Sequence, residues 1–174
     1  MSAIRASHAR VWRLGADVDT DALAPGHAMK HGIEVIARHC LETLRPDFAP
    51  GVRAGDVIVA GSNFGIGSSR EQAADVLVQL GVAAVIAPSF GGLYFRNAFN
   101  VGLLLLTCEN ADRLAEGERI SFDARAGQIV AAGGQVLATE SIPGFLLDMV
   151  EAGGLLAQLQ QRLQKGNLHE RSPL

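Results

Sequence analysis

Residues 61–73 read GSNFGIGSSREQA, a run of three glycines, three serines, an arginine and a glutamate between two apolar stretches. The stretch DVIVAG (56–61), which leads into it, predicts a short apolar strand. Apolar positions at helical spacing over 73–80 predict an amphipathic helix. The segment is therefore a strand-to-helix turn. Two roles are open for it: it could cap the helix, or it could present polar groups to a ligand.

Outward from this turn, short apolar strands alternate with helices. We expect strands over 9–14, 56–61, 82–87 and 103–107, and helices over 33–44, 73–80 and around 93–100. This alternation is typical of a parallel sheet. After Gly117, three short strands separated by turn residues predict hairpins, and two helices follow. The sequence thus predicts an α/β fold with a mostly parallel central sheet and additional hairpin strands.

The length of 174 residues suits one compact domain. We expect a single domain over residues 1–165 and a polar, frayed tail over residues 166–174. Hydrophobic residues make up 48% of the chain, which is enough for a buried core and argues against disorder.

The charge pattern and the apolar pattern exclude two classes of partner. The formal net charge is −3 and the basic residues are scattered, which argues against a nucleic-acid-binding protein. No apolar run approaches the roughly 18 residues that span a bilayer, and the N-terminal segment lacks the features of a signal peptide. We therefore expect a cytoplasmic protein that binds neither nucleic acid nor membrane.

The two cysteines, Cys40 and Cys108, are far apart and each lies among apolar neighbours. We interpret them as buried free thiols in a reducing compartment; a disulfide or a metal-binding pair is the alternative. Neither belongs to a spaced cysteine cluster, so this chain alone does not carry the ligands of an iron–sulfur centre.

Local patterns support both roles of the turn. Ser68 with Glu71, and Ser69 with Gln72, have the spacing of capping boxes. A helix N-terminus also attracts anions, and Arg70 in a first helical turn would oppose the helix dipole. A residue that breaks a local rule favours a functional explanation, and a guanidinium is well shaped to bind a carboxylate.

A nucleotide-binding loop is the obvious rival, because Gly65 and Gly67 follow a strand. The third small position of that fingerprint is occupied by Arg70, and the next strand ends in Pro88 and Ser89 instead of an acid for the ribose. No Gly-Lys-Ser/Thr follows, which excludes a P-loop.

Three segments, DVDTDALAPG (17–26), GSNFGIGSSREQA (61–73) and APSFGGLYFRNAFNVGL (87–103), carry a resemblance to a known family. Their order and spacing resemble the small subunit of 3-isopropylmalate dehydratase, the separate-chain counterpart of the swivelling C-terminal domain of aconitase. The resemblance runs from about residue 8 to about residue 150. It implies a swivelling β/β/α domain of the aconitase C-terminal type.

The resemblance also implies an activity and a partner. The family moves water on and off hydroxy-dicarboxylic acids in leucine biosynthesis, and its [4Fe-4S] cluster sits in a separate large subunit. We therefore expect a hydro-lyase that acts only with that subunit and binds no cofactor itself. The alternatives are a related hydratase for dimethylmalate, homoaconitate or citrate, and a non-catalytic nucleotide-binding module with the same fold.

Carried over by motif, Ser68 is the general base that removes a proton alpha to a carboxylate, and Ser69 lies beside it. Arg70 binds a substrate carboxylate. Asp21 matches the family's acid near the substrate; an Asx turn ahead of Pro25 is the alternative.

Some positions depart from the family's pattern or need separate interpretation. Gln72 stands where the motif commonly has histidine. The segment GHAMKHG (26–32) replaces the loop that reads the variable side chain of the substrate, and Lys30 is its candidate partner for a carboxylate. A mobile surface loop is the alternative. We interpret Arg96 and Asn97 as a scaffold for the turn.

Overall fold

The computed structural model describes residues 2–169, with the backbone alone over residues 166–169. Seven strands of this part of the chain form one sheet in the order β4-β3-β2-β1-β5-β6-β7. The strands are β1 (Arg5–Arg13), β2 (Val57–Val59), β3 (Ala84–Ala87), β4 (Leu104–Thr107), β5 (Arg119–Asp123), β6 (Gln128–Val130) and β7 (Val136–Ala138).

The sheet has a parallel half and an antiparallel half that share β1. Strands β1 to β4 run parallel, and every residue of β2 and β3 is buried, as expected for strands covered on both faces. Strands β5, β6 and β7 add to the other edge of β1 as antiparallel neighbours. The predicted α/β class, with a parallel centre and extra hairpins, is confirmed.

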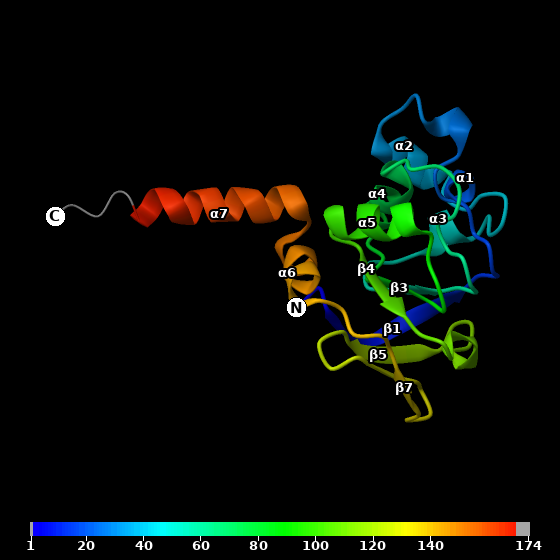
Figure 1. Cartoon of the computed structure of the whole chain (residues 1–174). Helices are drawn as coiled ribbons and strands as arrows, with labels where there is room; N and C mark the ends of the chain where they lie inside the picture. Colours follow the sequence, from blue (N-terminus) through cyan, green and yellow to red (C-terminus); the bar gives the residue numbers. More distant parts are fainter. Residues whose placement is uncertain (1, 170–174) are drawn as a thin grey trace.

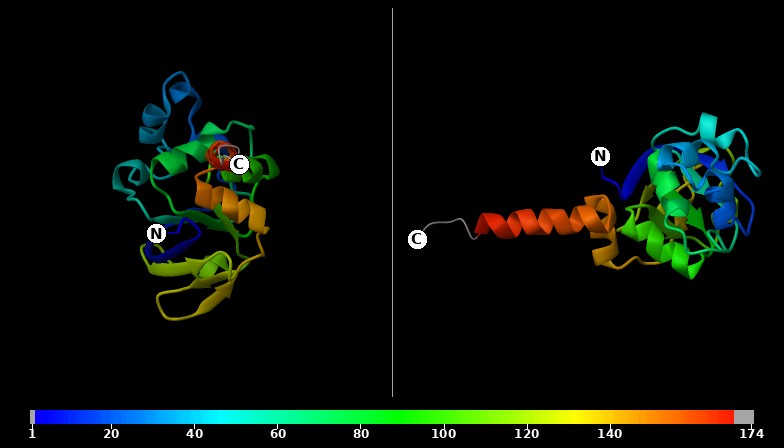
Figure 2. Two further views of the ribbon diagram at one scale, coloured as in Figure 1. Left: turned by 90° about the vertical axis from the view of Figure 1, so that its left-hand side faces the viewer. Right: turned by 90° about the horizontal axis from the view of Figure 1, so that it is seen from above.

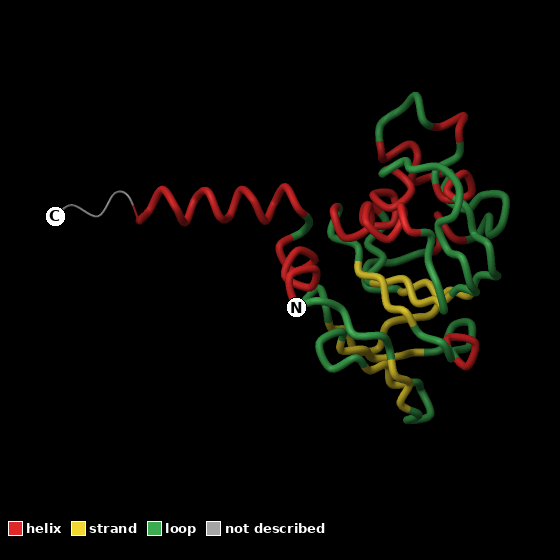
Figure 3. Tube along the Cα trace, viewed as in Figure 1, coloured by secondary structure: helices red, strands yellow, loops and turns green. Residues whose placement is uncertain are grey.

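Helices and short helical turns fill the connections. They are α1 (Thr20–Leu23), η1 (Gly26–Ala28), α2 (Ile33–Arg38), α3 (Phe48–Gly51), α4 (Gln72–Gln79), α5 (Gly92–Asn100), η2 (Ala111–Arg113), α6 (Gly144–Ala152) and α7 (Leu155–His169). In Figure 1 the helices α2, α4 and α5 lie on one side of the parallel strands, and β5 and β7 lie on the other. Figure 3 shows this as helical and strand layers joined by long loops.

The structure corrects the predicted helix over 33–44. The helix α2 ends at Arg38, and Leu41 adopts a left-handed conformation with φ 60°. The Leu41 N–H donates to the Ala22 carbonyl 2.8 Å away, so the chain turns toward α1 and the helix stops. Cys40 and Leu41 are buried as the pattern predicts, but Leu44 is half exposed.

The first strand is longer than predicted. It begins at Arg5 instead of residue 9, because a register shift between Ala6 and Ala9 lets β1 continue along β5. His8, inside this shift, has φ 58°, the conformation of a bulged residue.

One carboxylate is buried beside the central strand. Asp56, just before β2, accepts hydrogen bonds from the side chains of Arg10 and Trp12 and from the backbone N–H of Arg53. Burial on its own raises the pKa of Asp56, but these donors outweigh it and hold the pKa below its ordinary value. The carboxylate therefore joins β1, β2 and the segment before β2.

Cys40 and Cys108 are both buried and free, as predicted. Burial raises the pKa of each thiol. Within residues 2–169, no helix is long and apolar enough to cross a membrane.

The last helix leaves the body of the molecule. Figures 1 and 2 show α7 projecting away from the sheet, beyond α6. At its base the backbone of Gly154 comes so close to residues 100–102 that an added Cβ would lie 2.6 Å from the Asn100 carbonyl oxygen. The helix is described through His169, past the expected start of the tail at residue 166, and residues 170–174 lie outside the described part.

Candidate active site

The turn that follows β2 is held between two other loops at the carboxyl end of the parallel strands. On one side the Gly65 N–H donates to the Val18 carbonyl at 2.7 Å. On the other side the Gly91 N–H donates to the Phe64 carbonyl at 2.9 Å. The three segments that carry the family resemblance, remote in sequence, thus meet at one edge of the sheet, where open α/β folds bind ligands.

Gly65 makes this packing possible. Its φ of +80° is a conformation that side chains rarely adopt, and an added Cβ would lie 2.1 Å from Cγ of Tyr94. The Tyr94 hydroxyl in turn donates to the Ala73 carbonyl in α4. The turn therefore rests on α5 through a contact that only glycine permits.

Ser68 lies exposed at the tip of the turn and faces α1. Its Oγ is 3.1 Å from Oγ1 of Thr20, and its backbone N–H donates to the same Thr20 oxygen at 3.0 Å. Either hydroxyl can donate in this pair, so Thr20 can donate to the Ser68 oxygen when that oxygen has lost its own proton. Thr20 is almost fully buried, so it is a fixed partner for the exposed serine.

Sequence reasoning missed Thr20. The residue belongs to the segment DVDTDALAPG that carries the resemblance, but a lone threonine has no spacing signal of its own. Its position follows from backbone pairing, since the Thr20 N–H donates to the Ile66 carbonyl at 2.9 Å.

Arg70 and Asp21, both predicted site residues, are brought together. Nη1 of Arg70 lies 2.7 Å from Oδ1 of Asp21 and donates to the Ala24 carbonyl at 2.9 Å. The hydrogen bonds of Arg70 to the described residues use Nη1, which leaves the Nη2 and Nε edge for a ligand. Asp19, and not Asp21, makes the local side-chain bond to the backbone in this segment: it is the N-cap of α1, and its Oδ1 accepts from the Ala22 N–H.

The predicted capping boxes are wrong. The helix α4 begins at Gln72, and its N-cap, Glu71, makes no side-chain cap hydrogen bond. Ser68 and Ser69 precede the helix and leave their hydroxyls for other partners or for solvent. Gln72 is exposed at the start of the helix.

Asn97 supports the turn from α5, as predicted. Its side-chain amide donates to the Ser69 carbonyl at 2.8 Å, and the residue is almost buried. Arg96, its neighbour, is exposed. Ser69 is therefore fixed through its backbone while its side chain remains exposed.

Within the described residues, Lys30 makes no hydrogen bond or ion pair to the turn. It is exposed, just after η1, in the segment that links η1 to α2. A cavity of about 380 Å³ lies beside α1, lined by Asp17, Asp19, Asp21, Ala22, Pro25, Gly26, Thr43 and Leu44. Its carboxylates make it unfavourable for an anion in the free chain, so an anionic ligand needs cations from Arg70, Lys30 or a partner.

The residues of this chain do not fit an iron–sulfur cluster. A [4Fe-4S] centre takes four cysteine thiolates, whereas the chain has two cysteines, both buried. Within the described residues, the one group of three or more potential metal ligands is His27, His39 and Glu42.

This fold and this site define a domain of the aconitase C-terminal class, and residues 48–111 match the family model described as the aconitase C-terminal domain. The 3-isopropylmalate dehydratase small subunit of Syntrophus aciditrophicus is 42% identical over 156 residues, covering 88% of this chain and 95% of the relative. The chain belongs to the family of 3-isopropylmalate dehydratase small subunits.

Two further relatives bear on its chemistry. The methanogen homoaconitase small subunit of Methanothermobacter thermautotrophicus is 42% identical over 161 residues, covering 90% of this chain and 92% of the relative. The crystal structure of 3-isopropylmalate dehydratase (leuD) from Methanocaldococcus jannaschii is 36% identical, with a TM-score of 0.87 over 95% of this chain and 98% of that chain. The expected swivelling fold is thus confirmed.

Proposed function

We propose that this chain is the small subunit of a hydro-lyase that interconverts 2-isopropylmalate and 3-isopropylmalate by dehydration and rehydration. The observation that carries the proposal is the pairing of Ser68 with Thr20 beside the pairing of Arg70 with Asp21, on one exposed edge of the fold. The names of the relatives support the same reaction.

The reaction needs a base and a carboxylate-binding group. In dehydration a base takes the proton from the carbon alpha to a carboxylate. The electron pair of the broken C–H bond forms the double bond, and the hydroxyl on the neighbouring carbon accepts a proton and leaves as water. Rehydration at the other carbon completes the isomerisation. Ser68 is the proposed base. Arg70 binds a substrate carboxylate through the edge that Asp21 leaves open.

Ser69 and Asp21 complete the proposed substrate site. Ser69 presents its exposed hydroxyl beside the base, with its backbone held by Asn97. Asp21 is 71% exposed at its side chain and orients the guanidinium of Arg70. Its role is to aim the cation, because a carboxylate that faced the substrate directly would repel it.

The energetics require the large subunit. Acting as a base near neutrality requires a serine alkoxide to be stabilised by roughly 8 kcal/mol relative to water. A helix terminus contributes at most about 2 kcal/mol, and α4 begins only at Gln72. Arg70, the hydrogen bond from Thr20 and exclusion of water must supply the rest. The large subunit, with its [4Fe-4S] cluster, would complete this environment when the complex forms, so the isolated chain should be inert.

Homoaconitate is the second candidate substrate. The homoaconitase relative is as similar to this chain as the isopropylmalate relative, so identity does not separate the two. Lys30 could bind the additional carboxylate of a tricarboxylate, whereas the neighbouring Met29 could contact an isopropyl group. We favour the alkyl substrate, with Lys30 turned toward solvent or the partner.

The test is reconstitution with the large subunit of the same organism. The complex should convert 2-isopropylmalate, and it should prefer this substrate to homoaconitate, dimethylmalate and citrate. Either subunit alone should show no activity. Preference for another acid would replace the substrate, whereas an inactive complex together with nucleotide binding by the lone chain would favour a non-catalytic module.

A further inference from the structure

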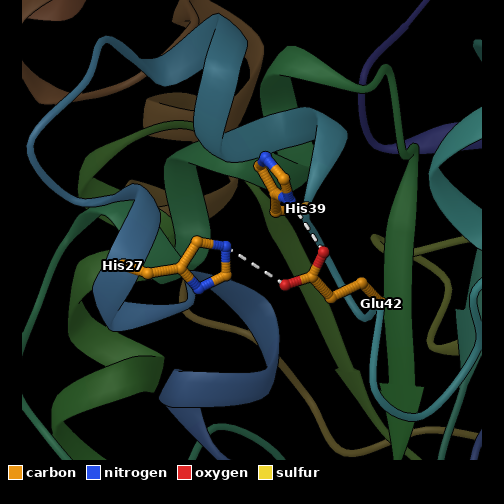
Figure 4. A group of neighbouring side chains, drawn as sticks. All are labelled: His27, His39 and Glu42. Carbon is orange, nitrogen blue, oxygen red and sulfur yellow. Dashed lines mark hydrogen bonds and ion pairs between the residues drawn. The ribbon is translucent and has the colours of Figure 1, made fainter.

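Two histidines and a glutamate that the proposed reaction does not use converge near the loop that contains Lys30 (Figure 4). His27 lies in η1, His39 caps the end of α2, and Glu42 follows in the next turn. Figure 4 shows the Glu42 carboxylate beside the two rings, with one oxygen toward each. Oε1 is 3.3 Å from Nε2 of His27, and Oε2 is 2.7 Å from Nδ1 of His39.

The spacing suits a shared metal ion. One ligand atom from each residue lies within 4.8 Å of the others. Ligand atoms about 2.0–2.1 Å from a tetrahedral ion are roughly 3.3 Å from one another. The ligand atoms therefore need to move by only a small amount to surround an ion, and the half-exposed side chains leave room for that movement and for water.

The donor set selects the kind of ion. Two imidazoles and one carboxylate suit zinc and its neighbours among the transition metals, whereas Mg²⁺ and Ca²⁺ prefer oxygen ligands alone. Three protein ligands leave at least one position for water. Cys40, next to His39 in sequence, is fully buried and does not compete for the ion.

We propose that His27, His39 and Glu42 bind a divalent transition-metal ion of the zinc class. The ion would join η1 to the end of α2, and the segment between these two points contains residues 29–32 and α2 itself. Lys30 and His31 in this segment are exposed. A bound ion would therefore hold the two ends of the segment together. The metal site itself does not depend on the proposed reaction.

The experiment is calorimetric titration of the full-length, tag-free chain with Zn²⁺, with Mg²⁺ as the comparison ion. The wild-type chain should bind one Zn²⁺ and no Mg²⁺. His27→Ala, His39→Ala and Glu42→Gln should each weaken Zn²⁺ binding at least about tenfold. His31→Ala is the matched control, because His31 lies in the same loop but outside the cluster, and it should bind as the wild type does.

Cobalt spectroscopy supplies a second readout. Co²⁺ at the site should give visible absorption bands of a low-coordinate ion, and the three ligand variants should lose them. Circular dichroism of the metal-free variants should match the wild type, because the cluster lies at the surface. Failure of Zn²⁺ to bind, equal binding by folded ligand variants, or an equal loss in His31→Ala would each overturn the proposal.

Discussion

Arg70 and Asp21 form an ion pair across two loops, with Nη1 of Arg70 2.7 Å from Oδ1 of Asp21. The guanidinium also donates to the Ala24 carbonyl, so its position is set by two oxygens from one side. Asp21 is largely exposed, and such a pair in water adds little to stability. Its consequence is geometric, because it fixes the direction of the planar donor edge that remains.

Arg70→Lys should chiefly raise KM, by about 10- to 100-fold, in the reconstituted complex. An ammonium group cannot reproduce two parallel hydrogen bonds to a carboxylate. Steady-state kinetics on 2-isopropylmalate measure this effect. Asp21→Asn, which keeps the shape and removes the charge, should have a smaller effect of the same kind. Unchanged KM and kcat in Arg70→Lys would place Arg70 outside the substrate site.

Ser68→Ala should lower kcat by several orders of magnitude per assembled complex, because it removes the proposed base. Its thermal stability should stay close to that of the wild type, since Ser68 does not cap α4. Ser62→Ala, on the same turn but away from Thr20, is the control and should keep its activity. Activity of Ser68→Ala within a few fold of wild type would show that another group is the base.

Thr20→Val should lower kcat by about tenfold and change KM less, because it removes a hydroxyl that can donate to Ser68. Loss of that donor also disfavours the charged form of the base, so the rising, acid-side limb of the pH–activity profile should move to higher pH. Thr20→Ser should restore both the rate and the pH profile. A uniform loss of rate with an unchanged profile would assign Thr20 a structural role only.

Lys30→Met distinguishes the two candidate substrates. A hydrophobic pocket separates substrates by only about 1–3 kcal/mol per methylene group, whereas an unpaired buried charge costs more. If isopropylmalate is the substrate, the variant should keep most of its activity. Comparison of kcat/KM on isopropylmalate and homoaconitate checks this. A large loss confined to homoaconitate, in an enzyme that preferred it, would reverse our choice of substrate.

Asp56 should make the fold sensitive to acid. Its pKa is held low in the folded chain, so its contribution to stability is complete above the ordinary pKa of about 4 and is lost as the pH falls through the folded value. Asp56→Asn should lower the free energy of unfolding by about 3 kcal/mol at neutral pH. The free energy of unfolding, measured by denaturant titration between pH 7 and pH 3, should fall less steeply with falling pH in the variant than in the wild type. Parallel curves would mean that other carboxylates control acid unfolding.

The strands β2, β3 and β4 could be predicted because they lie in apolar runs, a signal that is present within each segment. The capping boxes could not be judged in the same way, because Ser68 turns toward Thr20, a partner 48 positions earlier in the chain. The same limit explains the helix over 33–44, which a hydrogen bond from Leu41 to Ala22 ends early. Local patterns predict elements, and contacts between distant loops decide how those elements end.

The candidate site shows the same division. The resemblance named Ser68, Arg70 and Asp21, but the contact between Arg70 and Asp21 appears only when the two loops pair along the sheet edge. Thr20 carries no motif that marks it. The cluster of His27, His39 and Glu42 could not be predicted from a local pattern either, because it forms only where η1 packs beside the end of α2.

The two buried thiols have a practical consequence for measuring how this subunit docks. Since Cys40 and Cys108 are inaccessible and their pKa values are raised, a maleimide dye should react slowly with the native chain. A single cysteine introduced on the exposed face of α7, for example at Leu156, could then be labelled selectively without first removing the natural ones. Energy transfer from such a dye to one on the large subunit would follow the relative motion of the two chains during turnover.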